Sequence, residues 1–85
     1  MLENELFDNM YRLTMQLKGA PLKEYEKQAM VDEFNHAEGP AFERAKAAIA
    51  HVLHGKPSFI VEKGKVLDDV NQMIKDVKKA AETIE

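Results

Sequence analysis

The final stretch of the chain, from Lys65 to Glu85, carries the pattern that most restricts its fold. Its apolar residues recur at alternating spacings of three and four: Leu67, Val70, Ile74, Val77, Ala81 and Ile84. This spacing places them along one side of an α-helix, with charged residues on the opposite side. Because such an apolar stripe must be shielded from water, we expect the earlier segments to form helices that cover it.

The composition favours a single all-helical domain inside the cell. The chain has 85 residues, which is the size of one small domain, and only four glycines and three prolines. It contains no cysteine, which excludes disulfides, cysteine-based zinc sites and thiol nucleophiles and suits a reducing cytoplasm. The N-terminus is acidic, unlike a signal peptide, and no apolar run is long enough to span a membrane. We therefore predict one cytoplasmic domain over residues 1–85.

A first helix is predicted from Glu3 to Lys18, and it carries two apolar stripes. One stripe suits a core: Leu2, Leu6, Met10, Leu13 and Leu17. The other is offset from it by about 100° around the helix and consists of Phe7, Tyr11 and Met15. One interpretation is that this helix packs between two others in the same chain. The alternative, which we carry forward as a prediction, is that Phe7, Tyr11 and Met15 bind a second copy or a target protein.

Gly19 and Pro21 mark the boundary to a second helix, predicted from Pro21 to about Asn35. Glycine suits the left-handed position that ends a helix, and proline suits the first turn of the next one. The second helix is the least regular, because its apolar residues fall on two faces. Leu22, Tyr25 and Ala29 share one face, and Met30 and Phe34 share the other.

Gly39 and Pro40 introduce a third helix, predicted from Pro40 to His54. Its apolar stripe is formed by Phe42, Ala45, Ile49, Val52 and Leu53. Gly55 and Pro57 then end the helix.

The segment Ser58–Gly64 has two interpretations. Ser58 is a favoured cap for a long final helix, whereas Phe59, Ile60 and Val61 suit a short strand. We expect helix, because no second strand is available to pair with it. A final helix that begins at Ser58 overhangs the first helix, and its uncovered stripe suits a homodimer.

Candidate chemical sites are sparse. Glu33 and His36, and likewise His51 and His54, have spacings that place two metal ligands on one helix face, but each pair lacks the further ligands that a metal site needs. No hydroxyl lies in a context that implies an activating base, and no glycine-rich phosphate loop is present. The sequence therefore predicts no metal, no cofactor, no catalytic residue and no small-molecule substrate.

The segment Phe42–Lys46 (FERAK), followed by His54–Pro57 (HGKP), resembles the small helical immunity proteins of bacteriocin producers. The resemblance covers about a quarter of the chain. It implies an antiparallel helix bundle of similar size, and it carries no functional residue over to this sequence.

These observations predict an all-α fold, a small four-helix bundle in up-down order with a long C-terminal helix, because short connections make neighbouring helices antiparallel. A three-helix variant is the alternative. The absence of catalytic patterns favours a non-enzymatic protein that binds another protein, as an inhibitor, immunity factor or regulatory adaptor. The alternative is a nucleic-acid-binding module that uses the third helix and the lysines from Lys56 to Lys65. The net charge of −3 argues against it, since phosphate binding needs a basic surface.

Overall fold

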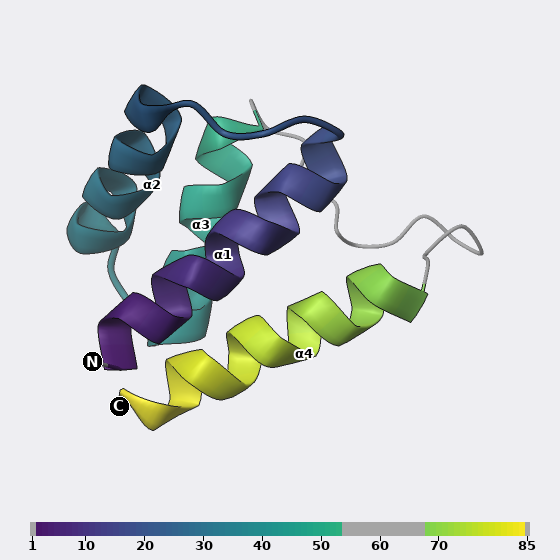
Figure 1. Ribbon diagram of the computed structural model, residues 1–85. Coiled ribbons are helices and arrows are strands. Elements are labelled where there is room, and N and C mark those ends of the chain that lie inside the picture. The colour runs from purple at the N-terminus through teal and green to yellow at the C-terminus, as the bar shows by residue number, and fades with distance from the viewer. Residues whose placement is uncertain (1, 54–67, 85) are drawn as a thin grey trace.

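The computed structural model describes residues 2–53 and 68–84, and within these ranges the chain forms four helices and no strand (Figure 1). They are α1 (Leu2–Lys18), α2 (Glu24–His36), α3 (Ala41–Val52) and α4 (Asp68–Thr83). The prediction of a small all-α four-helix bundle with a long C-terminal helix is confirmed, and the three-helix alternative is wrong. The helix or strand predicted for Ser58–Gly64 lies outside the described residues.

The helices pack as two antiparallel pairs (Figure 1). α1 packs along α4, so that the start of α1 lies near the end of α4, and α2 packs along α3. α3 joins the two pairs, because it also contacts α4 and, to a lesser extent, α1. By contrast, α1 and α2 are consecutive in the chain but are not among the helix pairs that pack extensively. Contact between α1 and α2 is therefore made mainly by long side chains, such as Phe7 with Phe34.

The predicted turns at Gly19 and Gly39 are present, and both glycines have a positive φ, but α2 begins later than predicted. The helix end predicted at Gly55 lies outside the described residues. Gly19 has a φ of 78° and donates its backbone N–H to the carbonyl of Met15 at 2.8 Å, which ends α1. Pro21 does not occupy the first turn of α2, in contrast to the prediction. Lys23 instead caps the helix from an extended conformation, and its backbone N–H donates to the Glu26 carboxylate at 2.8 Å. The exposed N–H that starts α2 is thus satisfied by a side chain within the helix itself.

The core draws on all four helices, and its buried residues match most of the predicted stripes. They are Leu6, Met10, Leu13, Leu22, Met30, Phe34, Ala41, Ala45, Ala48, Ile49, Val52, Val70, Val77, Ala80 and Ala81. On α4 the stripe is centred on Val77, which is fully buried. Ile74 and Ile84 pack against the core but remain partly exposed. Ile74, a member of the predicted stripe, therefore lies on its flank rather than at its centre.

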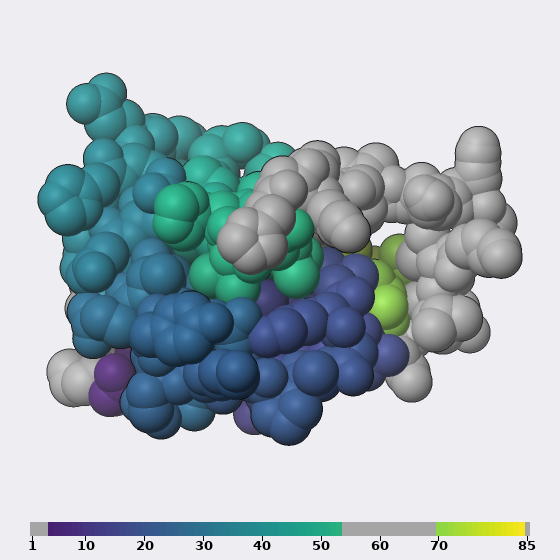
Figure 2. Space-filling model, turned by 90° about the horizontal axis from the view of Figure 1, so that it is seen from above, coloured from purple at the N-terminus to yellow at the C-terminus, as the bar shows by residue number. Residues whose placement is uncertain are grey.

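The end of α1 is joined to the start of α2 by an ion pair. The Lys18 ammonium donates to both oxygens of the Glu26 carboxylate, at 2.7 and 2.6 Å. This hydrogen bond from Lys18, followed by the one from the Lys23 backbone, holds the pKa of Glu26 below its ordinary value of 4.5. Seen from above in Figure 2, the end of α1 and the start of α2 form one continuous surface.

The Glu26 contacts predict acid-sensitive stability. Because the pKa of Glu26 is lower in the folded chain than in the unfolded chain, its contribution is present above pH 4.5 and is lost as the pH falls through the folded value. Glu26→Gln keeps the shape of the side chain but cannot ionise. We expect the free energy of unfolding, measured by urea titration between pH 6 and 3, to fall less steeply for Glu26→Gln than for the native chain. Parallel curves for the two proteins would contradict this expectation.

Candidate protein-binding surface

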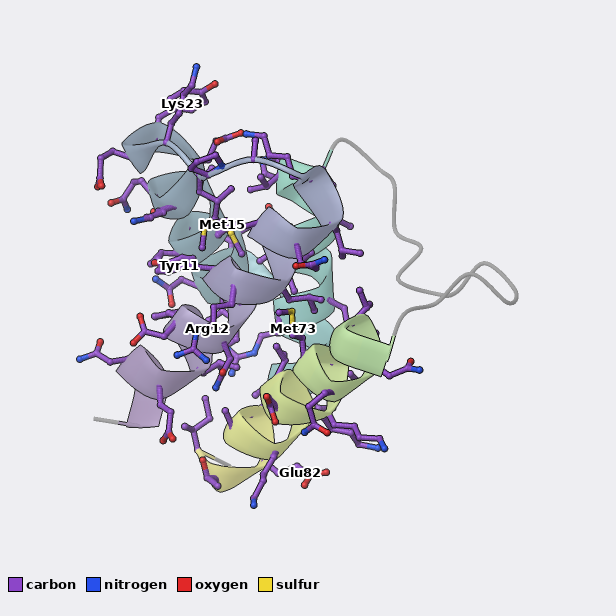
Figure 3. The ribbon with its side chains drawn as sticks, turned by 45° about the vertical axis from the view of Figure 1, so that its right-hand side comes forward. Tyr11, Arg12, Met15, Lys23, Met73 and Glu82 are labelled. Carbon is purple, nitrogen blue, oxygen red and sulfur yellow. The ribbon has the colours of Figure 1, made fainter. Side chains whose placement is uncertain are left out.

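Phe7, Tyr11 and Met15 lie along the side of α1 that is next to the core stripe. All three are partly buried and pack against the hydrophobic core. Their spacing of four residues keeps them in one row, and they belong to the side chains that lie between α1 and α2. Figure 3 labels Tyr11 and Met15, which project from α1 on the side of α2. We call these three residues, together with Lys27 of α2, the α1–α2 face.

Phe7 is held in place by an aromatic contact with α2. Its ring meets that of Phe34 edge to face, with the centroids 5.3 Å apart and the planes at 88°. Arg44 of α3 lies on the same Phe34 ring, with its guanidinium carbon 4.4 Å from the centroid. The Nε of Arg44 is buried without a hydrogen-bond partner, which is consistent with a guanidinium held by the ring rather than by a carboxylate. Phe7 therefore takes part in packing within the molecule.

Tyr11 lies in the middle of the row and is held from the α2 side. The ammonium of Lys27 stands 5.6 Å from the centroid of the Tyr11 ring. Partial burial, and then the negative charges of Asp8 and Glu24, raise the pKa of Tyr11 above its ordinary value of 10.0. The Tyr11 hydroxyl therefore stays protonated at neutral pH and can donate a hydrogen bond to a partner.

The packing of α1 between helices of the same chain accounts for part of the second stripe. Phe7 contacts α2 through Phe34, and Phe7, Tyr11 and Met15 all keep part of their surface exposed. Binding of a partner by Phe7, Tyr11 and Met15 stays a prediction. The stripe was visible in the sequence, but the supporting roles of Phe34 and Lys27 were not.

Of the apolar face predicted for Leu22, Tyr25 and Ala29, Tyr25 is the exposed member. It is 69% exposed, whereas Met30 and Phe34 on the other face of α2 are buried. Beside it lies an open cavity of about 200 Å³, lined by Tyr25, Glu26, Ala29, His51 and Val52.

A second surface that the sequence did not reveal is a polar groove between α1 and α4. It contains two adjoining cavities, of about 290 and 200 Å³. The first is lined by Glu5, Asn9, Asp76, Lys79, Ala80 and Thr83, and the second by Asn9, Arg12, Gln72, Met73 and Asp76. In both α1 and α4 the polar lining residues recur at helical spacing, which the sequence shows. That α1 faces α4 is shown only by the tertiary structure.

The histidine pairs considered as metal ligands are placed on the surface or beyond the described ranges. His36 is exposed, and its Nδ1 lies 2.8 Å from the backbone carbonyl of Asp32. His51 is exposed as well, and His54 lies outside the described residues. Among the side chains that the structure describes, in residues 4–53 and 70–84, no three from histidine, aspartate or glutamate gather closely enough to hold a metal ion.

The lysines from Lys56 to Lys65, on which the nucleic-acid alternative depends, also lie outside the described residues. None of the helices described is both long and apolar enough to cross a bilayer.

No protein-family model matches the chain, and it has no significant match among curated proteins or solved structures.

Proposed function

We propose that this protein acts in the cytoplasm by binding another protein through the α1–α2 face, without catalysing a reaction of its own. One observation carries the proposal. Three large side chains of α1 remain partly exposed although each is fixed by packing within the molecule. Aromatic and methionine side chains are favoured at the centres of interfaces, where they provide a large contact area. Anchors that are already held in place lose little conformational entropy on binding.

The class of partner follows from the same residues. Tyr11 offers an apolar ring and a hydroxyl donor, and Met15 offers a flexible apolar side chain. Such a surface suits the apolar side of a helix or loop that carries a hydrogen-bond acceptor. An inhibitor, immunity factor or regulatory adaptor would use a surface of this kind, and the absence of cysteine suits work in a reducing compartment.

Site-specific photo-crosslinking tests this proposal in the native host. A photoreactive phenylalanine analogue replaces Tyr11 in one variant and Tyr25 in a matched control, so that both variants exchange an aromatic residue for an aromatic one. We expect a discrete covalent product from position 11 that is absent from position 25. The same products from both positions, or none from position 11, would contradict the proposed surface.

A binding measurement with the identified partner completes the test. Tyr11→Ala is expected to raise the dissociation constant by at least about tenfold, which is typical of an interface anchor. Tyr25→Ala is expected to leave it unchanged. Phe7 is a poor choice for this experiment, because its contact with Phe34 makes loss of binding indistinguishable from loss of folding.

A further inference from the structure

The groove between α1 and α4 carries charges of both signs in an alternating arrangement. Glu5 of α1 and Lys79 of α4 line one cavity, and Arg12 of α1 lines the other together with Asp76 of α4. Along α1 the order is therefore acid then base. Across the groove, Lys79 shares the first cavity with Glu5, and Asp76, which lines both cavities, shares the second with Arg12. We call Glu5, Arg12, Asp76 and Lys79 the charge square. Figure 3 labels Arg12 on α1 and Met73 on α4, which both line the second cavity.

None of these four side chains forms an ion pair within the described part of the chain, where the ion pairs are Lys18 with Glu26, Lys27 with Glu24, and Lys46 with Glu43. The polar contacts in the groove stay within each helix. Asn9 donates to the carbonyl of Glu5 at 3.0 Å, Arg12 donates to Asn9 at 3.4 Å, and Gln72 donates to Asp76 at 3.0 Å. The opposite charges of α1 and α4 are thus close in space but not joined to each other.

We propose that a second copy of the chain docks on this groove, about a two-fold axis that runs parallel to the two helices. Such a rotation places α1 of each copy on α4 of the other at the same level along the groove. Glu5 then faces Lys79 of the second copy, and Arg12 faces Asp76. By symmetry each contact occurs twice, as in any interface formed by the same surface on both copies.

The position of Asp76 selects this axis over one that crosses the groove. Asp76 and Asn9 line both cavities, so they lie near the middle of the groove. An axis across the groove at that level would place Asp76 against Asp76 of the second copy, and like charges held together are unfavourable. The axis along the groove instead places Asp76 opposite Asn9 and Arg12.

This interface differs from the α1–α2 face and does not depend on it. At about 100° per residue, the row of Glu5, Asn9 and Arg12 is centred roughly 120° around α1 from the row of the α1–α2 face. A dimer through the groove therefore leaves both α1–α2 faces free. Because each copy carries a net charge of −3, association depends on the local pattern of charge, and it is expected to weaken as salt is added.

Sedimentation equilibrium of the full chain over a wide concentration range tests the proposal. We expect the native chain to dimerise and the Glu5→Lys and Lys79→Glu variants each to weaken the dimer by about tenfold. The double variant Glu5→Lys with Lys79→Glu restores the opposite signs and is expected to dimerise like the native chain. Both side chains are exposed, so circular dichroism melts should match those of the native protein.

Two further variants distinguish this dimer from a general effect of net charge and from a dimer about the crossing axis. Glu38→Lys changes the net charge as Glu5→Lys does, but at an exposed position between α2 and α3, and is expected to leave the dimer intact. The double variant Glu5→Lys with Arg12→Glu would keep opposite signs facing each other only if the axis crossed the groove. Its dimerisation at native strength would overturn the proposed axis. A native chain that stays monomeric, or single variants that dimerise normally, would overturn the proposal itself.

Discussion

Phe34→Ala is expected to lower the free energy of unfolding by about 3–5 kcal/mol. Phe34 of α2 is 2% exposed and contacts two other helices, α1 through the Phe7 ring and α3 through the Arg44 guanidinium. Its removal leaves a cavity and also deprives the partly buried Arg44 guanidinium of the ring that it contacts. For a domain of this size the total stability is roughly 4–13 kcal/mol, so one such change is a large part of it.

Two control variants show whether the loss of stability comes from the contacts of Phe34 with Phe7 and Arg44. Phe34→Leu keeps most of the apolar volume and is expected to cost much less, mainly the aromatic contribution of about 0.5–1.5 kcal/mol. Tyr25→Ala removes an exposed ring from the same helix and is expected to change the stability by less than about 0.5 kcal/mol. Urea titration followed by circular dichroism measures all three. If the Phe34→Ala protein were as stable as the Tyr25→Ala protein, the contacts of Phe34 with Phe7 and Arg44 would contribute nothing to stability.

Ile49→Ala is expected to cost about 2–5 kcal/mol, whereas Ile74→Ala should cost less than half as much. The two substitutions remove the same atoms. Ile49 is fully buried in the second half of α3, a helix that contacts the other three helices. Ile74 lies partly exposed on α4. The cavity left at position 49 is closed, whereas solvent reaches the space left at position 74.

Denaturant titration of the two variants measures this difference directly. Val77→Ala is a useful third variant, because Val77 is fully buried and lies one turn from Ile74 on the same helix. If Ile74→Ala were as destabilising as Ile49→Ala, the centre of the α4 stripe would have to be moved from Val77 to Ile74.

The local pattern of the sequence determined the helices and most of their buried sides. Repeats of three and four residues are set by the helix itself, so Met10 and Leu13 of α1 and Val77 and Ala81 of α4 were identified as core before any packing was known. The left-handed conformation of Gly19 was also predictable, because it depends on the steric freedom of a single residue. The row of Phe7, Tyr11 and Met15 was visible for the same reason.

Only the tertiary structure decided which flank of each stripe is covered and which surfaces meet. Periodicity cannot distinguish the two faces of α2, so the burial of Phe34 and the exposure of Tyr25 depend on where α1 and α3 lie. The same holds for the groove, because Glu5 and Lys79 are far apart in sequence and share a cavity only when α1 and α4 pack antiparallel. A repeat within one helix specifies directions around its axis, whereas the neighbour in each direction depends on contacts between distant segments.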